Sequence, residues 1–386
     1  MNDARDREHF DTLVIGGGQA GLAAGYHLAR RGLDFVILDA SERVGDVWRS
    51  RWDSLRLFTP AAYDGLPGMP FPSPGHYFPT KDEFADFLEG YAEHFRLPVR
   101  SGVRVDELTR RGDVFLVGAG DRRYEADNVI VALGSYQEPK EPDFAAALHP
   151  SLTTLHSFDY RAPSQLQPGP TLLVGAGNSG AEIAVELARE RRVILAGRDT
   201  GELPFRPRST AARFLWLPLV LRILFRKVLS IRTPIGRARR PALVGRGGPL
   251  IRVKKRDLAA AGVERVGRVT GVREGMPVVD DGRVLDEVRN VIFCTGFETG
   301  FESWIRLPVH GGVHDHEPRH QGGIVSDQPG LYFLGLHFLR SLASGMIQGV
   351  GDDAAFVVDH LARRQGRGPG GGARVGARGM AGRPAA

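Results

Sequence analysis

The stretch TLVIGGGQAGLAAGYHLARRGLDFVILDA, residues 12–40, decides the fold of this chain. An apolar run leads into the spacing Gly16-x-Gly18-x-x-Gly21, a helix-forming segment follows, and a second apolar run ends at Asp39. This order predicts a βαβ unit of a parallel sheet. In such units the first glycine permits a tight turn, the second lets the backbone approach a pyrophosphate, and the third lets the helix pack on the strand.

The same arrangement occurs a second time. LLVGAGNSGAEIA, residues 172–184, carries Gly175-x-Gly177-x-x-Gly180 between an apolar run and a helix-forming segment. Each fingerprint is followed much later by an apolar run that ends in a glycine turn, VIVALGS (129–135) after the first and VIFCTGF (291–297) after the second. The sequence therefore predicts an α/β protein with two Rossmann-like dinucleotide-binding domains, the second inserted in the first.

This nesting sets the expected domain boundaries. We expect residues 1–160 and 295–362 to form the outer domain, which binds FAD, and residues 161–294 to form the inserted NADP-binding domain. Residues 203–256 hold fifteen Lys and Arg and no acid, and form a basic insert in the second domain. Residues 363–386 are rich in Gly, Arg and Ala, and are expected to be a disordered basic tail.

Composition excludes several other classes of protein. The chain has 386 residues, 42% hydrophobic and 25% charged, which is ordinary for a globular protein with two domains. The first ten residues are polar, so no signal peptide is expected and the cytoplasm is the predicted location. Cys294 is the single cysteine, so neither an internal disulfide nor a redox-active cysteine pair is expected. No zinc-finger, RNP or helix-turn-helix pattern accompanies the basic charge, so nucleic acid is not a predicted partner.

The ends of the second strands indicate which nucleotide each unit binds. Asp39, at the tip of FVIL (35–38), can accept hydrogen bonds from a ribose with both hydroxyls free. In the second unit Ala196 occupies that place and Arg198 lies two residues further on, which favours the 2′-phosphate of NADP. Asp199 follows directly and keeps NADH open as the alternative. FAD and NADPH are the expected pair of cofactors.

The segment FLWLPLVLRILFRKVLSI, residues 214–231, is unusually apolar for a soluble chain. Arg222, Arg226 and Ser230 fall at i, i+4 and i+8, which predicts one narrow polar stripe on an apolar α-helix. We expect this helix to cover the NADP domain or to form a subunit contact in a homodimer. The alternative is a peripheral helix that lies in a membrane interface.

Together these motifs resemble the single-chain FAD- and NADPH-dependent flavin-containing monooxygenases, and within them the bacterial flavoproteins related to plant auxin-forming flavin monooxygenases. The resemblance covers about residues 10–360. It rests on GGGQAGL (16–22), VGDVW (44–48), WDSLRLFTP (52–60), LPGMPFP (66–72), YFPTKDEF (77–84), LHSFDYR (155–161), GAGNSGAEIA (175–184) and CTGF (294–297).

The resemblance implies a set of cofactor-binding residues and no catalytic side chain. The residues expected at the two cofactors are Gly16, Gly18, Gln19, Ala20, Gly21, Asp39, Trp48, Leu55, Arg56, Val105, Ala132, Gly134, Gly175, Gly177, Asn178, Ser179, Gly180, Arg198, Thr295 and Gly296. His156 and Tyr160 belong to the linker motif before the second domain, and a satisfied core histidine is the alternative for His156.

The histidines of VHGGVHDHEPRHQGG, residues 309–323, are not interpreted as a metal site, because the stretch is loop-like and flavin chemistry needs no metal. Cys294 lies in an apolar strand and is expected to be a buried small hydrophobe.

The function implied is that of a monooxygenase. NADPH would reduce FAD, O₂ would add to give a C4a-peroxyflavin, and a small organic substrate would be oxidised. The alternative is an NADPH-dependent flavin oxidoreductase that passes electrons to a quinone or a protein partner. A non-catalytic flavoprotein that regulates ion or metal handling is a further alternative, favoured by the basic insert alone.

Overall fold

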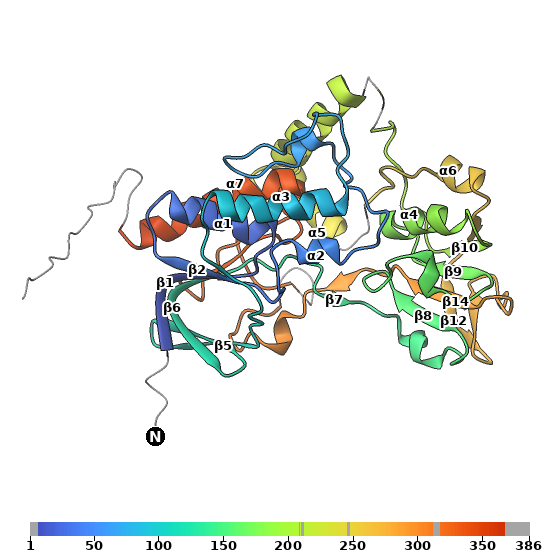
Figure 1. The fold of residues 1–386 in the computed structure, drawn as a ribbon, viewed down its shortest axis with the longest axis horizontal. Coiled ribbons are helices and arrows are strands. Elements are labelled where there is room, and N and C mark those ends of the chain that lie inside the picture. Colours follow the sequence, from blue (N-terminus) through green and yellow to red (C-terminus); the bar gives the residue numbers. More distant parts are fainter. Residues whose placement is uncertain (1–6, 208, 210–211, 245–247, 312–316, 367–386) are drawn as a thin grey trace, which may run out of the picture.

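The computed structural model describes residues 7–207, 209, 212–244, 248–311 and 317–366, which form two main sheets in two parts of the molecule that lie side by side (Figure 1). Among these residues, no helix has both the length and the hydropathy that crossing a membrane requires. Since the described residues end at 366, the predicted tail 363–386 lies almost wholly outside them. Its expected start at 363 is wrong, because helix α7 (Ile347–Arg364) extends through Arg364.

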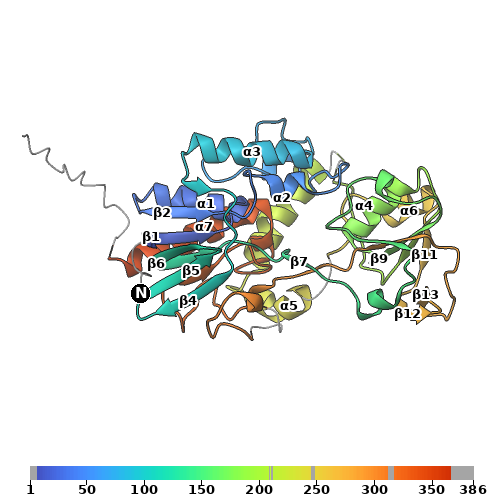
Figure 2. The ribbon, with the colours of Figure 1, turned by 60° about the horizontal axis from the view of Figure 1, so that its bottom comes forward.

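The first sheet has the strand order β3-β2-β1-β6-β5-β4, with β16 also paired to β6. Its strands are β1 (Arg7–Ile15), β2 (Phe35–Leu38), β3 (Val99–Arg100), β4 (Glu107–Arg111), β5 (Val114–Ala119), β6 (Arg122–Val131) and β16 (Leu331–Phe333). β4, β5 and β6 pair antiparallel, and the other pairs are parallel. Helices α1 (Gln19–Ala29), α3 (Lys81–His94) and α7 cover one side of this sheet (Figure 2).

The second sheet is all parallel, in the order β11-β10-β9-β14-β8. Its strands are β8 (Thr153–His156), β9 (Thr171–Val174), β10 (Val193–Ala196), β11 (Glu264–Val266) and β14 (Asn290–Phe293). Every residue of β9, β10 and β14 is buried, as expected for central strands covered on both faces. Helices α4 (Asn178–Leu187) and α6 (Lys255–Ala260) pack on it, and the hairpin β12 (Val269–Arg273)–β13 (Met276–Val279) flanks it.

Two short antiparallel strands, β7 (Glu138–Pro139) and β15 (Phe297–Glu298), connect the sheets. The chain leaves the first sheet through β7 and returns through β15, so the second sheet is nested within the first. The boundary expected at residue 160 is placed too late, because β8 already belongs to the second sheet. The remaining boundaries stay a proposal that this nesting supports.

The middle of the basic insert does not cover the NADP-binding sheet, which corrects that part of the expectation for residues 214–231. The π-helical segments η4 (Ala212–Trp216) and η5 (Pro218–Val228) and helix α5 (Pro234–Val244) lie against the FAD-binding part instead. Arg226 pairs with Asp352 of α7, and Arg240 pairs with Glu317 at 2.7 Å. The predicted stripe also ends early, because Ser230 lies beyond η5 and forms a bridge with Ser341.

Candidate functional site

The first glycine fingerprint lies at the carboxyl end of β1, where helix α1 begins. Gly16 has φ +106°, which favours glycine, and a Cβ on it would lie 3.0 Å from the Ala132 carbonyl oxygen. A Cβ on Gly21 would lie 1.8 Å from the Gly16 carbonyl oxygen. Gly18 has ordinary backbone angles and nothing within 4 Å of its Cβ position. The fold itself therefore requires Gly16 and Gly21, but it does not require Gly18.

The second fingerprint repeats this geometry. A Cβ on Gly175 would lie 2.2 Å from the Cys294 carbonyl oxygen, and one on Gly180 would lie 2.0 Å from the Gly175 carbonyl oxygen. Gly177, like Gly18, has nothing within 4 Å of its Cβ position. Each middle glycine thus precedes a helix and faces space that a Cβ would fill. A phosphate held at the helix N-terminus accounts for both, so the residues present fit two dinucleotides.

Asp39 directly follows β2, as predicted, and its position is fixed by the backbone around it. Its carboxylate accepts hydrogen bonds from the Gly17 N–H and, at 2.7 Å, from the Ser41 N–H. Its carbonyl oxygen accepts from the Val103 N–H at 2.8 Å. Val105, half-buried, lies two residues further along the same segment. The strand tip and this segment are therefore held together where the adenosine of FAD would lie.

Three strand ends of the first sheet meet beside the fingerprint. Ala132 and Gly134 follow β6, and Gly335 follows β16. A Cβ on Gly335 would lie 3.2 Å from the Ala20 Cβ and 3.4 Å from the Gly134 Cα. Gly335 was not among the predicted site residues. The signal was present, because GLYFLG (330–335) ends in a glycine as the other two apolar runs do.

Trp48 and Gln19, both expected at the cofactors, contact each other. The Trp48 Nε1 donates to the Gln19 Oε1 at 3.2 Å, and the indole meets the Phe84 ring edge-on at 4.9 Å between centroids. Leu55 is buried among residues of the second sheet. The Arg56 guanidinium donates to the Phe78 carbonyl oxygen at 2.9 Å. These residues therefore stiffen the loop between the two sheets.

The expected NADP end combines cations with a neutralised acid. Arg198 is exposed directly after β10. Asp199 pairs with Lys255, whose ammonium lowers the pKa of that carboxyl. Arg265 donates to the Gly197 carbonyl oxygen at 3.1 Å, which adds a second guanidinium at this turn. The acid that kept NADH open as an alternative is thus turned toward the basic insert.

Asn178 differs from expectation in how its side chain is used. Its Oδ1 accepts from the Ile251 N–H at 2.9 Å, and its Nδ2 donates to the Pro249 carbonyl oxygen at 3.0 Å. The amide therefore anchors the end of the basic insert, and only the main chain of Asn178 is available to a phosphate here. Ser179 is half-buried beside it in the first turn of α4.

Thr295 and Gly296 lie where the chain crosses between the sheets. The Thr295 hydroxyl donates to the Lys140 carbonyl oxygen, and Gly296 has φ +92° with open space at its Cβ position. Burial raises the pKa of the neighbouring Cys294 thiol to about 12, so this cysteine is not a thiolate near neutral pH.

The linker residues His156 and Tyr160 belong to the interior of the second domain. His156 is buried, its Nδ1 accepts from the Phe158 N–H at 3.1 Å, and burial lowers the pKa of the imidazole. The Tyr160 hydroxyl donates to Glu186 at 2.9 Å. Both side chains are part of the core here, although the Nε2 of His156 is buried without a hydrogen-bond partner among the described residues, so the histidine is only half satisfied.

The predicted histidine stretch shows no metal geometry where it is described. His320 lies 3.3 Å from Glu317, and His310 contacts the Ile305 carbonyl oxygen at 3.1 Å. In the described part of the chain, no three His, Cys, Asp or Glu side chains are grouped as a metal site would require. His314, Asp315 and His316 lie outside the described residues.

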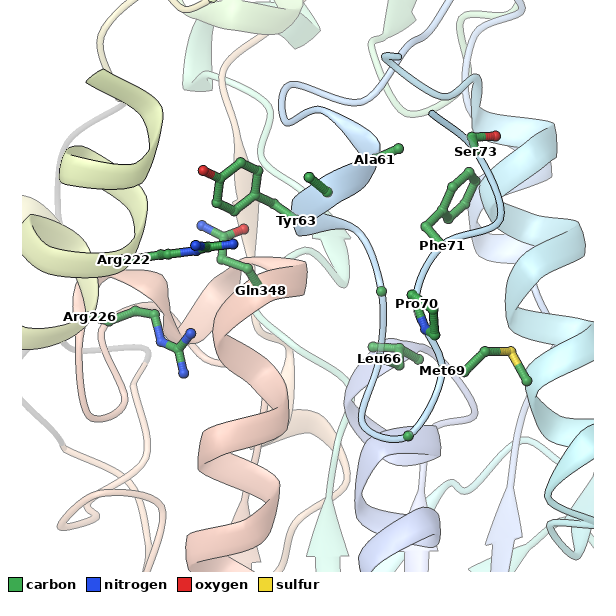
Figure 3. A pocket seen from close by; sticks show the side chains of 13 residues that line it. Ala61, Tyr63, Leu66, Met69, Pro70, Phe71, Ser73, Arg222, Arg226 and Gln348 are labelled. Atoms are coloured by element: carbon green, nitrogen blue, oxygen red, sulfur yellow. The ribbon is translucent and has the colours of Figure 1, made fainter. Parts of the chain in front are cut away.

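A cavity of about 590 Å³ lies between the loop 61–73, segment η5 and the first turn of α7 (Figure 3). The Arg222 guanidinium stands 5.3 Å from the Tyr63 ring centroid, and Gln348 points toward the same place. Leu66, Met69 and Phe71 give the cavity an apolar side. The sequence did not indicate Arg222 and Gln348 as neighbours, since more than one hundred residues separate them.

Asp64 is a buried residue of this loop, and its carboxyl is expected to make the free energy of unfolding depend on pH. Burial raises the pKa of its carboxyl from 3.8 to about 8, against the hydrogen bond from Thr59. As the pH rises from 3.8 to 8 the unfolded chain loses this proton while the folded chain keeps it, so the protein loses stability over that window. Asp64→Asn is therefore expected to raise the melting temperature more at pH 8 than at pH 5, by about 2–4 °C for each kcal/mol gained.

The control for this prediction is Asp121→Asn, in an exposed turn. Thermal unfolding by circular dichroism at both pH values measures the effect. A gain at pH 8 that is no larger than the gain at pH 5 would contradict the assignment to Asp64.

The two glycine turns each lie at the carboxyl ends of parallel strands, one turn in each sheet. This pair of nucleotide-binding turns defines an FAD- and NADPH-dependent oxidoreductase. Residues 13–209 match the model of a family described as pyridine nucleotide-disulphide oxidoreductase. The chain belongs to this family, and it is similar to flavin-containing monooxygenases of plants and bacteria. This confirms the resemblance, the fold class and the predicted cofactors.

Individual relatives match over most of the chain. An oxidoreductase of Geobacillus kaustophilus, called uncharacterized and CzcO-like, is 38% identical over 91% of this chain and 98% of its own. The indole-3-pyruvate monooxygenase YUCCA1 of Oryza sativa subsp. japonica is 29% identical over 76% of this chain and 78% of its own. The solved flavin-containing monooxygenase from Stenotrophomonas maltophilia superposes with a TM-score of 0.72 at 27% identity, over 93% of this chain and 99% of its own.

Proposed function

We propose that this protein is an NADPH-dependent monooxygenase that oxidises a small organic substrate with O₂ through a C4a-peroxyflavin. The observation that carries the proposal is the pocket in the FAD-binding part, which the aromatic and proline-rich loop 61–73 lines on one side. A flavin that only passes electrons gains nothing from such a wall. The named activities of the rice and Stenotrophomonas relatives support the same choice.

FAD would supply the oxygen chemistry, and the chain's own residues would bind, orient and exclude water. The middle glycines and the helix N-termini hold the phosphates of the two nucleotides. Phe71 of the loop packs against Phe84 and Phe87 of α3, with ring centroids 5.1 to 6.3 Å apart, and this aromatic packing would limit the access of water from this side. Arg222 and Gln348 offer polar groups to a substrate in the cavity.

Cys294 argues against disulfide chemistry in this member of the family. It is the single cysteine of the sequence, it is half-buried, and the raised pKa of its thiol leaves it poorly ionised near neutral pH. The two-thiol exchange of a disulfide reductase therefore has no second sulfur here. The remaining rival is the flavin oxidoreductase that delivers electrons to a quinone or a protein partner.

The test separates oxygenation from electron transfer. Enzyme reduced with NADPH without oxygen is mixed with O₂ in a stopped-flow instrument. We expect a near-ultraviolet band of the C4a adduct that lasts for seconds or longer, because the walled site slows the release of hydrogen peroxide. Enzyme reduced with dithionite, which lacks bound NADP⁺, is the control and should lose the band faster. Direct return to oxidised flavin in both samples would favour the oxidoreductase.

A further inference from the structure

Segments η4 and η5 carry a concentration of exposed apolar side chains. Phe214 is 69% exposed and Leu215 is 58% exposed. In the described part of the chain, most exposed large apolar side chains belong to this segment. We define the outer apolar face as Phe214, Leu215, Trp216, Leu219, Ile223 and Leu224. A contiguous apolar surface of this kind marks a contact site rather than ordinary protein surface.

The opposite side of the same segment explains how it is held. Ala212, Leu217 and Leu221 are buried and form a cluster with Tyr63 of the cavity loop. Arg226, on η5, pairs with Asp352 of α7. The segment is therefore fixed to the FAD-binding part by its inner side, and this packing leaves the outer apolar face toward solvent.

Exposed cations lie next to the outer apolar face and on the segment that follows it in the chain. The Arg213 guanidinium stands 5.0 Å from the Phe214 ring centroid. Lys227, Arg232, Arg237 and Arg239 are also exposed on the following turn and on α5. The whole insert, residues 203–256, contains no Asp or Glu. The segment that carries the face therefore combines exposed apolar side chains with exposed positive charge.

We propose that the outer apolar face docks on an anionic membrane surface. Segments that lie in a bilayer interface combine buried Trp, Phe and Leu with Lys and Arg at the headgroups, which is the composition found here. A second copy of the chain fits less well. A two-fold contact would place the face against itself and would bring the cations together without an acid of the insert to oppose them. The proposal does not depend on the proposed function.

Cosedimentation of the purified, FAD-loaded protein with lipid vesicles tests the proposal. We expect pelleting with equimolar phosphatidylcholine and phosphatidylglycerol, little with phosphatidylcholine alone, and a loss at high salt. Phe214→Ser with Leu215→Ser should weaken binding at least about tenfold, since both side chains lose apolar contact. Arg213→Ser with Lys227→Ser should weaken it about fivefold for each charge.

Arg189→Ser with Arg273→Ser is the matched control, because it removes the same charge from exposed positions on the NADP-binding part. This control should bind like the unchanged protein. Equal NADPH oxidation by all variants shows that they are folded, since none of the three pairs lies at a cofactor.

Three results would overturn the proposal. One is the absence of pelleting with anionic vesicles, and another is equal pelleting of the unchanged protein and the Phe214/Leu215 variant. The third is a dimer in sedimentation velocity that this variant converts to a monomer, which would assign the face to a second copy of the chain.

Discussion

The substitution Gly18→Ala is expected to give a folded protein that has lost most of its FAD. Nothing lies within 4 Å of the new Cβ in the protein itself, and the backbone angles suit alanine. The methyl group would instead occupy the space that the pyrophosphate needs. Overpacking of this kind costs about 1–3 kcal/mol, which corresponds to roughly five- to 150-fold weaker binding. The ratio of flavin to protein absorbance after gel filtration measures the loss.

Two other glycines serve as controls for this prediction. Gly177→Ala has the same free surroundings in the second unit and should keep its FAD while the KM for NADPH rises. Gly21→Ala should reduce the amount of folded protein, because its Cβ would lie 1.8 Å from a carbonyl oxygen. Full FAD retention by Gly18→Ala, confirmed as FAD by chromatography of the heat-released cofactor, would argue against the first cradle.

The substitution Arg198→Ala is expected to remove most of the preference for NADPH. A hydrogen bond between a guanidinium and the 2′-phosphate contributes about 1.5–3 kcal/mol. The ratio of kcat/KM for NADPH to that for NADH should therefore fall about ten- to a hundredfold. The measurement is steady-state oxidation of the two nucleotides by the same preparation.

Lys255→Ala tests the electrostatic part of this argument. Without the ammonium, the Asp199 carboxylate would stand beside the 2′-phosphate without its partner, so the same ratio should fall. Arg189→Ala, an exposed arginine after α4, is the matched control and should leave the ratio unchanged. An unaltered ratio in Arg198→Ala would transfer the role to Arg265 or Arg206.

The sequence alone determined the two βαβ units, their order and the nature of their ligands. These features depend on local patterns: an apolar run, a glycine spacing and a helix follow one another within about thirty residues. Gly16 and Gly21 must be glycines because a Cβ at either position would lie against backbone atoms of the same unit or of the neighbouring strand. The sequence could therefore predict the roles of both residues. Asp39 was predictable for the same reason, because it ends the second strand of its unit.

Only the tertiary structure decided how the distant segments are used. β8 joined the second sheet through pairing with β14, which lies far along the chain. The Asn178 side chain hydrogen-bonds to the main chain of Pro249 and Ile251, although nucleotide contact was expected of this residue. The Asp199 carboxylate pairs with Lys255. Segments η4 and η5 of the insert lie on the FAD-binding part because their inner apolar side packs on Tyr63 and Arg226 pairs with Asp352. Such contacts depend on which surfaces the folded sheets bring together, and no pattern within a short window carries that information.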